Sequence, residues 1–137
     1  MTSHQMPPNE YQELTAAQVA ERMHCTTAVV YDREKNGEFF ALLPPARING
    51  RRYPAFQLHE RLDRHLLTKI IQEFRKARVS TNQLWGFLRT VQKEFGDKTA
   101  VDILLGASSP ALDGLSVSQR AEAVMDIANE ELSRTAH

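Results

Sequence analysis

The stretch that decides the fold of this chain, residues 14–57, reads LTAAQVAERMHCTTAVVYDREKNGEFFALLPPARINGRRYPAFQ. Its first ten residues are typical of a capped helix. The Thr15 hydroxyl can accept a hydrogen bond from the backbone N–H of Gln18, and the Gln18 side chain can reach back to Thr15, which is the capping-box spacing. We therefore expect a helix that begins just after Thr15.

A second helix is expected after a break at residues 24–26. Thr26 or Thr27 can cap this helix, and Asn36-Gly37 can end it. Two short helices joined by about three or four residues form the compact unit that places its second helix in a DNA major groove. The stretch therefore favours a DNA-binding transcriptional regulator over an enzyme.

A short hairpin is expected next. Residues 38–43 are apolar and partly aromatic, which suits a strand. Asn49-Gly50 follows, and this dipeptide is the strongest signal for a two-residue hairpin turn, because both of its residues tolerate positive φ. Arg47 precedes the turn, and Arg51 and Arg52 follow it. Three guanidinium groups around one turn can clamp a phosphate backbone; the alternative is a solvated loop whose arginines only confer solubility.

Length and composition fit one or two small folded domains. The chain has 137 residues, of which 42% are hydrophobic, and no apolar run approaches the ~20 residues that span a bilayer. The start of the chain lacks the basic and apolar regions of a signal peptide, and we expect residues 1–13 to be a disordered tail. The single cysteine, Cys25, cannot form an intramolecular disulfide, which fits the cytoplasm that we expect for this protein.

The net charge is zero, but the charges are segregated along the chain. Residues 1–60, 61–98 and 99–137 carry net charges of −1, +5 and −4. A basic footprint over the whole chain is absent, which counts against strong non-specific binding to nucleic acid. Local clusters of charge must therefore carry any DNA binding.

The second half of the chain predicts helices. Apolar side chains recur at every fourth position of residues 58–79: Leu58, Leu62, Leu66, Ile70 and Phe74. We interpret this pattern as an amphipathic core helix with a solvated basic face. The alternative is a dimer helix, because four apolar residues keep a 3-4-3 spacing: Leu67, Ile70, Phe74 and Ala77.

Further helices follow. Ser80 or Thr81 starts a helix that extends to residue 95, with Gly96 as its stop. Trp85 lies beside the apolar face of that helix and is expected to be a core or interface anchor. Asp97 is expected to cap another short helix.

A last helix opens at Ser116, which has the capping-box spacing with Gln119. Its outer side is acidic: Glu122, Asp126, Glu130 and Glu131. An amphipathic helix with an acidic rim can dock in a hydrophobic cleft with basic edges. The alternative is that this helix completes the core of a dimer.

The chain shows only weak signals for catalysis or metal binding. His59 and His65 are six residues apart, so they do not share the helix face that two zinc ligands need. His24-Cys25 offers two donors without a second pair. We expect no catalytic residue, no metal and no cofactor, and therefore not an enzyme.

Residues 14–57 resemble the MerR-like and excisionase-like helix-turn-helix modules. The resemblance rests on residues 14–23, Val30-Tyr31, Asn36-Gly37 and residues 50–57. The run 50–57 is similar to the junction at which such modules join an MbcA/ParS/Xre-type antitoxin C-terminal domain. Residues 84–132 are similar to that domain in outline, through residues 84–88, residues 109–116 and the closing helix.

The resemblance implies a mainly α fold, with an N-terminal winged helix-turn-helix that carries a short β-hairpin wing, followed by a helical bundle. It implies that Thr27, Ala28 and Tyr31 of the second helix face the major groove and that Arg47, Arg51 and Arg52 form the wing contacts. We also expect Lys35, on the second helix, to bind DNA. This sequence departs from the pattern at Asp32, where a basic or polar residue is common, and at Arg33 and Glu34, where apolar residues are usual. A carboxylate near DNA phosphates costs binding unless it accepts from a cytosine amine.

The predicted organisation is a tail at residues 1–13, a DNA-binding domain at 14–57 and a dimerisation or partner-binding domain at 58–134. We expect a homodimer on double-stranded DNA, without membrane contact. The alternative is an antitoxin or adaptor that binds another protein through its C-terminal helices. In that alternative, the resemblance implies that the bound partner is a RES-type toxin, an enzyme that consumes NAD. The candidate residues of this chain that contact the partner are Trp85, Glu122, Asp126 and Glu130.

Overall fold

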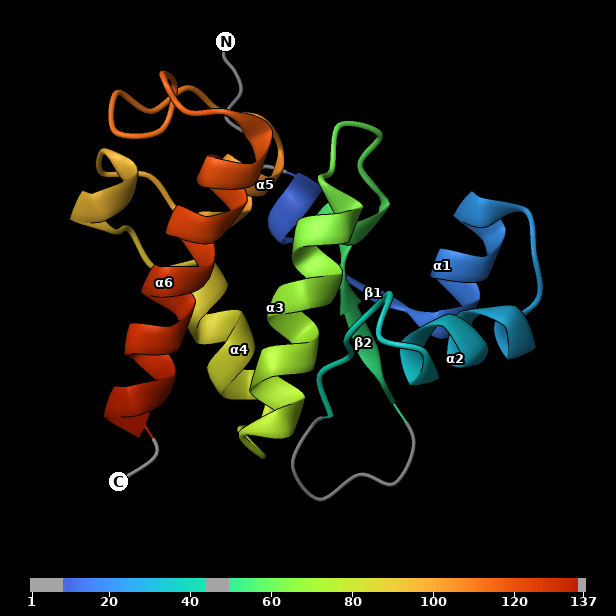
Figure 1. Cartoon of the computed structure of the whole chain (residues 1–137). Helices are drawn as coiled ribbons and strands as arrows, with labels where there is room; N and C mark the ends of the chain where they lie inside the picture. The colour runs from blue at the N-terminus through green and yellow to red at the C-terminus, as the bar shows by residue number, and fades with distance from the viewer. Residues whose placement is uncertain (1–8, 44–49, 136–137) are drawn as a thin grey trace, which may run out of the picture. The chain divides into compact units, whose positions relative to one another are not determined.

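The computed structural model describes residues 9–43 and 50–135, and it is mainly helical with one small two-stranded antiparallel sheet (Figure 1). The chain divides into two compact units, and the boundary along the sequence lies between Leu62 and Asp63. The expected boundary, between residues 57 and 58, falls at the end of a 3₁₀ helix, η2 (Ala55–Leu58), and Leu58 packs against the core of the first unit. None of the helices that the structure describes is long and apolar enough to cross a membrane.

The N-terminal unit starts earlier than expected. Part of the predicted disordered tail is ordered, because η1 (Asn9–Tyr11) is a 3₁₀ helix and β1 (Glu13–Thr15) is a strand. The backbone N–H of Ala55 donates to the Gln12 carbonyl at 2.7 Å, which ties this segment to η2. The prediction is therefore wrong for residues 9–13, while residues 1–8 lie outside the described residues.

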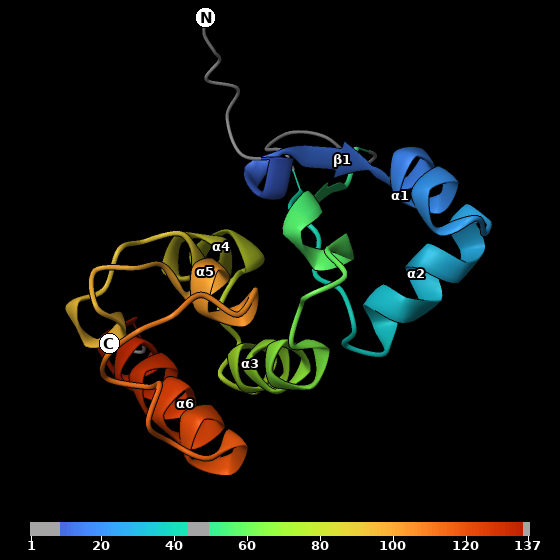
Figure 2. The same ribbon diagram turned by 90° about the horizontal axis from the view of Figure 1, so that it is seen from above.

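The two helices of this unit form as the sequence predicts. Helix α1 (Ala16–Met23) begins with the reciprocal capping box between Thr15 and Gln18, at 3.1 and 2.8 Å. Helix α2 (Thr27–Lys35) is capped by Thr26, whose hydroxyl accepts from the Val29 N–H at 3.4 Å. Figure 2 shows β1 leading into α1 and α2 following after a tight turn. The expected helix, turn and helix are confirmed in this segment.

The predicted hairpin is wrong in its register. Strand β2 (Arg52–Pro54) pairs antiparallel with β1, with Leu14 opposite Tyr53. Arg52 also exchanges both backbone hydrogen bonds with Leu42, at 2.7 and 2.9 Å. A two-residue turn at Asn49-Gly50 would instead place Arg52 opposite Arg47. Asn49 and Arg47 themselves lie outside the described residues.

The expected strand at residues 38–43 is reduced to this single bridge at Leu42. The physical reason is that a side chain takes the place of a neighbouring strand. The Gln57 amide accepts from the Phe40 N–H at 2.8 Å and donates to the Phe40 carbonyl at 3.0 Å. The same amide nitrogen also donates to the Pro54 carbonyl at 3.2 Å.

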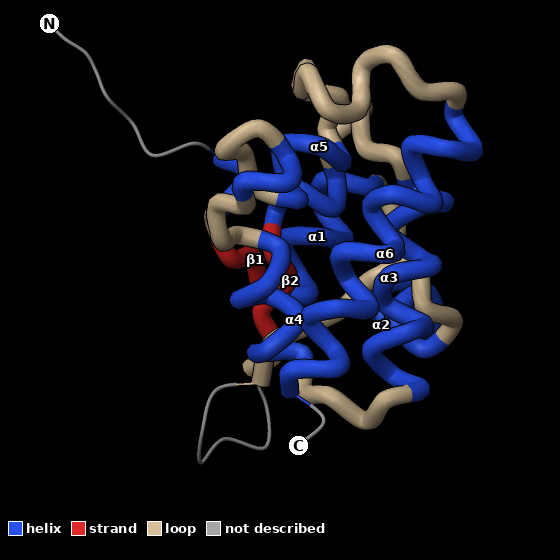
Figure 3. Tube along the Cα trace, turned by 60° about the vertical axis from the view of Figure 1, so that its left-hand side comes forward, coloured by secondary structure: helices blue, strands red, loops and turns tan. Residues whose placement is uncertain are grey.

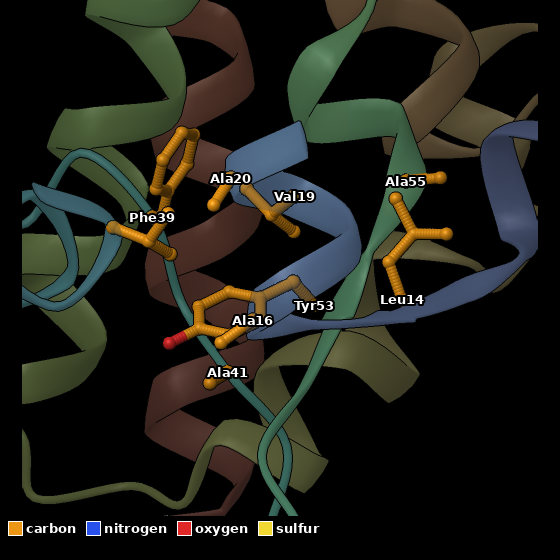
Figure 4. Packing of buried hydrophobic residues seen from close by; sticks show 9 residues of the cluster. Leu14, Ala16, Val19, Ala20, Phe39, Ala41, Tyr53 and Ala55 are labelled. Atoms are coloured by element: carbon orange, nitrogen blue, oxygen red, sulfur yellow. The ribbon is translucent and has the colours of Figure 1, made fainter. Parts of the chain in front are cut away.

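The core of the N-terminal unit gathers one apolar face from each helix and the sheet (Figure 4). Figure 3 marks these helices and strands along the Cα trace. Its largest members are buried: Leu14, Val19, Val30, Phe39 and Tyr53. The rings of Phe39 and Tyr53 meet edge to face, with their centroids 6.4 Å apart. Val30 is the only buried residue of α2, so most of that helix faces away from this core.

The C-terminal unit is a set of packed helices: α3 (Arg64–Lys76), α4 (Thr81–Leu88), α5 (Ala100–Leu104) and α6 (Val117–Thr135), with the 3₁₀ helix η3 (Lys93–Phe95). The predicted helix at residues 58–79 is too long at both ends. It starts after Asp63, whose carboxylate accepts from the Leu66 N–H at 3.1 Å. It ends before Arg78, whose φ of 59° is incompatible with a right-handed helix.

The predicted helix from Ser80 to residue 95 is right at its start and wrong at its end. Ser80 caps α4 by accepting from the Gln83 N–H at 3.2 Å. The helix stops at Leu88 because the backbone of Gln92 pairs with Lys98 in an isolated antiparallel bridge, which requires an extended conformation. Phe95 still reaches the core, from η3.

The caps of the last two helices differ in how well local sequence predicted them. The cap of α5 is Thr99, through a capping box with Asp102, and the expected cap Asp97 is therefore wrong. The cap of α6 is confirmed, because Ser116 and Gln119 make both reciprocal hydrogen bonds, at 3.0 and 3.2 Å.

The apolar stripe of α3 faces its own unit. Leu67 and Ile70 are fully buried and Phe74 is 2% exposed. Phe74 packs against Phe87 of α4, with ring centroids 5.7 Å apart. The interpretation as an amphipathic core helix is confirmed, and the alternative in which this stripe is a dimer seam is wrong.

The buried amide of Gln57 yields a stability prediction. The Gln57→Ala change leaves the N–H and carbonyl of Phe40 buried without these partners, so we expect the free energy of unfolding to fall by about 2–4 kcal/mol. Gln12→Ala is the matched control, because the Gln12 side chain is exposed, and we expect a change within about 0.5 kcal/mol. Urea unfolding followed by circular dichroism measures both. Equal stability of the two variants would contradict this role of Gln57.

Candidate nucleic-acid interface

A groove in the N-terminal unit collects most of the predicted DNA-binding residues that the structure describes. It has a volume of about 330 Å³. Its lining comes from three segments: Thr15, Ala16 and Ala17 at the start of α1, Thr27 and Tyr31 on α2, and Gly50, Arg51 and Arg52 before and in β2. Residues far apart in the sequence therefore meet at one surface.

One face of α2 borders this groove. Thr27, Tyr31 and Lys35 follow one another at every fourth position, which places them on the same side of the helix. All three are exposed, and Tyr31 keeps 46% of its surface accessible. Ala28 is exposed as well, on the neighbouring strip of the helix. This face is available to a ligand because the only buried residue of α2, Val30, points elsewhere.

Glu34 holds Arg51 in place at the groove. The guanidinium of Arg51 lies 3.2 Å from the Glu34 carboxylate, and it also stacks over the Tyr31 ring at 5.7 Å from the centroid. Glu34 also accepts a hydrogen bond from the Tyr53 hydroxyl, at 2.6 Å. The Glu34 carboxylate, where the helix-turn-helix pattern usually has an apolar residue, is therefore ion-paired within the N-terminal unit and orients the Arg51 guanidinium.

Arg33, the second departure from the pattern, is also paired. Its guanidinium lies 4.0 Å from the carboxylate of Glu38, and both side chains are partly exposed. Neither Arg33 nor Glu34 occupies a core position of α2. Asp32 is exposed and does not line the groove. Its carboxylate therefore lies beside the helix face that Thr27 and Tyr31 form at the groove, which we call the Thr27–Tyr31 face, and not on it.

Arg52 is anchored by its own segment. Its guanidinium donates to the Gly50 carbonyl at 3.1 Å and to the Arg51 carbonyl at 3.4 Å. Its backbone is fixed by Leu42 on one side and by β1 on the other. Arg51 and Arg52 are thus held by contacts other than the predicted two-residue turn. Arg47, the third predicted wing residue, lies outside the described residues.

The sequence did not reveal that the start of α1 shares this groove. Ala16 and Ala17 occupy the first turn of the helix, where backbone N–H groups have no partner within the helix. These groups and the helix dipole favour anions, as do the two arginines opposite. The signal that could have pointed here is the capping box at Thr15, which fixes where the first turn lies.

The predicted partner-binding residues do not form one surface. Trp85 is 2% exposed in the core of the C-terminal unit, so its assignment to a partner surface is wrong for this conformation. Its ring carries the Arg89 guanidinium at 5.5 Å from the centroid. By contrast, the side chains of Glu122, Asp126 and Glu130 are exposed on α6.

The Glu34 carboxylate yields a prediction that separates its two roles. Glu34→Ala removes the acceptor of the buried Tyr53 hydroxyl, and we expect a loss of about 1–3 kcal/mol in the free energy of unfolding. Glu34→Gln keeps an acceptor oxygen for the Tyr53 hydroxyl and loses the ion pair with the exposed Arg51, which costs less than about 1 kcal/mol. Thermal unfolding of both variants measures the difference. If the glutamine variant is as unstable as the alanine variant, the ion pair and not the hydroxyl contact stabilises this corner.

Tyr53 yields a pH prediction. Burial, reinforced by the hydrogen bond to Glu34, raises the pKa of Tyr53 above its usual value of 10.0. The folded state then keeps a proton that the unfolded state loses, so stability is full below about pH 10 and falls as the pH rises further. In Tyr53→Phe we expect this alkaline slope to be shallower by up to about 1.4 kcal/mol per pH unit. Urea unfolding between pH 8 and pH 11 measures the slopes, and identical slopes would contradict the assignment.

Comparisons with known proteins add no evidence about this interface. No family model, no curated protein and no solved structure matches this chain. The resemblance to helix-turn-helix modules and to an antitoxin C-terminal domain stays a prediction from sequence motifs.

Proposed function

We propose that the N-terminal unit binds double-stranded DNA as a helix-turn-helix domain and that the protein is a transcriptional regulator. The observation that carries this proposal is the groove in which the exposed Thr27–Tyr31 face of α2 meets Arg51 and Arg52. A capped helix, a tight turn and a second helix with an exposed polar face form the arrangement that such domains present to DNA.

In this proposal α2 is the helix that enters the major groove. Its exposed side chains provide a hydroxyl at Thr27, a methyl at Ala28, a phenol at Tyr31 and an ammonium group at Lys35. Hydroxyl groups contact either bases or phosphates, and a methyl can contact the thymine methyl. Of these four side chains, Lys35 alone can bind two acceptors of one base, guanine O6 and N7, so we expect modest discrimination between base pairs.

Arg51 and Arg52 contact the phosphate backbone in this proposal. The fold holds both guanidinium groups beside the first turn of α1, through Glu34 for Arg51 and through backbone carbonyls for Arg52. Two charge-assisted contacts and a helix N-terminus favour an anion at this place. Because Arg51 is also bound to Glu34, a phosphate must compete with a carboxylate for it, which limits binding to arbitrary DNA.

The alternative function, an antitoxin or adaptor, receives no specific support at its predicted contact residues. Trp85 is buried, and the exposed acidic side chains of α6 equally fit a solvated helix face. We therefore retain DNA binding as the proposed function.

The DNA-binding proposal is tested by a gel shift of the full chain on the DNA upstream of its own gene, against scrambled DNA. We expect Arg51→Ala and Arg52→Ala each to weaken binding to all sequences and to reduce the salt slope by about 1. Arg22→Ala is the matched control, since Arg22 is an exposed arginine of the same unit outside the groove. Equal affinity for scrambled DNA, no binding at low salt, or an effect of Arg22→Ala as large as that of Arg51→Ala would reject the proposal.

A further inference from the structure

A second groove lies in the C-terminal unit, on the flank where α3 and α6 pack side by side (Figure 2). Its volume is about 380 Å³. Ala121 and Met125 of α6, both half-buried, supply apolar surface within it, while His65 and Lys69 of α3 supply the opposite wall. This groove is separate from the candidate DNA interface, which belongs entirely to the N-terminal unit.

The groove continues into apolar surface that faces water. Val117, at the first position of α6, lines it and is 84% exposed, which is the largest exposure of any large hydrophobic side chain that the structure describes. Leu115, two residues before, is 38% exposed. Adjoining exposed apolar side chains with a polar rim are typical of interaction sites.

Opposite charges stand on the two rims of this groove. Lys69 is exposed on α3 and Glu122 is exposed on α6. Neither residue takes part in an ion pair within the part of the chain that the structure describes. Each rim is therefore open to a partner of the other sign.

We propose that a second copy of this chain occupies the groove, in a two-fold dimer that joins the α3–α6 flanks. A two-fold interface needs a self-complementary surface, because every contact between one residue of the first copy and another residue of the second copy occurs twice, once in each direction. One basic rim and one acidic rim across an apolar floor meet this requirement: Lys69 faces Glu122 of the partner subunit, and Glu122 faces the partner's Lys69. Val117 and Met125 are then covered by the same side chains of the second copy.

The charge balance of the C-terminal unit favours this occupant. Residues 63–137 carry ten Lys+Arg and ten Asp+Glu, so two copies do not repel each other through net charge. A toxin-like partner with a basic cleft would match only the acidic side of α6 and would leave Lys69 opposed to its own sign. A copy of the same chain matches both rims at once.

The experiment is sedimentation equilibrium of the full chain without DNA, so its outcome is independent of the DNA-binding proposal. We expect the wild type to sediment as a dimer of the 15.6 kDa chain. Lys69→Glu and Glu122→Lys each oppose like charges at both symmetric contacts, and we expect dissociation constants about tenfold weaker in each. Glu130→Lys is the control, because Glu130 is exposed on α6 outside the groove, and we expect it to dimerise as the wild type does.

Mixing the two variants makes the decisive measurement. In a heterodimer of the Lys69→Glu chain with the Glu122→Lys chain, both symmetric contacts again join opposite charges, so we expect the mixture to recover the wild-type affinity. Circular dichroism confirms that each variant is folded before it is mixed. A monomeric wild type at 100 µM, an effect of Glu130→Lys equal to that of Glu122→Lys, or no recovery in the mixture overturns the proposal and assigns the groove to a different protein or to none.

Discussion

The N-terminal unit depends on the side-chain amide of Gln57, which bonds to both backbone groups of Phe40. An amide that donates and accepts in this way imitates one rung of a strand ladder, and it does so where water cannot compete. It docks the segment from Phe39 to Leu42 against the chain that follows β2. Leu42 then pairs with Arg52, and this pairing fixes the position of Arg51 and Arg52 in the groove beside α1 and α2.

This constraint explains which elements could be predicted from the sequence. The caps at Thr15, Thr26, Ser80 and Ser116 involve residues three positions apart, and the local sequence contains everything that decides them. The register at Arg52 depends on Leu42 and Gln57, which no local pattern connects. Asn49-Gly50 is a strong turn signal in isolation, but a turn signal does not outweigh two backbone hydrogen bonds made elsewhere. The overlong helix at residues 58–79 has a related origin, since its apolar period runs through a boundary between two units.

The candidate site likewise combines residues that local sequence predicts with a residue whose role depends on contacts distant in the sequence. The exposed face of α2 follows from helical periodicity alone, so its residues could be named from the sequence. The role of Glu34 could not be predicted, because Arg51 and Tyr53, which it contacts, are 17 and 19 residues away. A carboxylate on a helix that is expected to face DNA looks unfavourable as long as its partners are unknown. With both partners in place it becomes the group that aims a cation and satisfies a buried hydroxyl.

Charge acts locally in each unit of this chain. Residues 1–62 carry seven Lys+Arg and seven Asp+Glu, and residues 63–137 carry ten of each. The basic excess at residues 61–98 is therefore not a footprint for nucleic acid, because the acidic excess of residues 99–137 balances it and lies in the C-terminal unit as well. At ordinary salt, the interaction between exposed charges is largely screened when they lie farther apart than about 8–10 Å. A neutral unit can still bind a polyanion where two arginines and a helix start converge, and a neutral unit with opposite rims can bind its own copy. The segregation of charge along the sequence therefore acts through those side chains that the fold brings within a Debye length of one another.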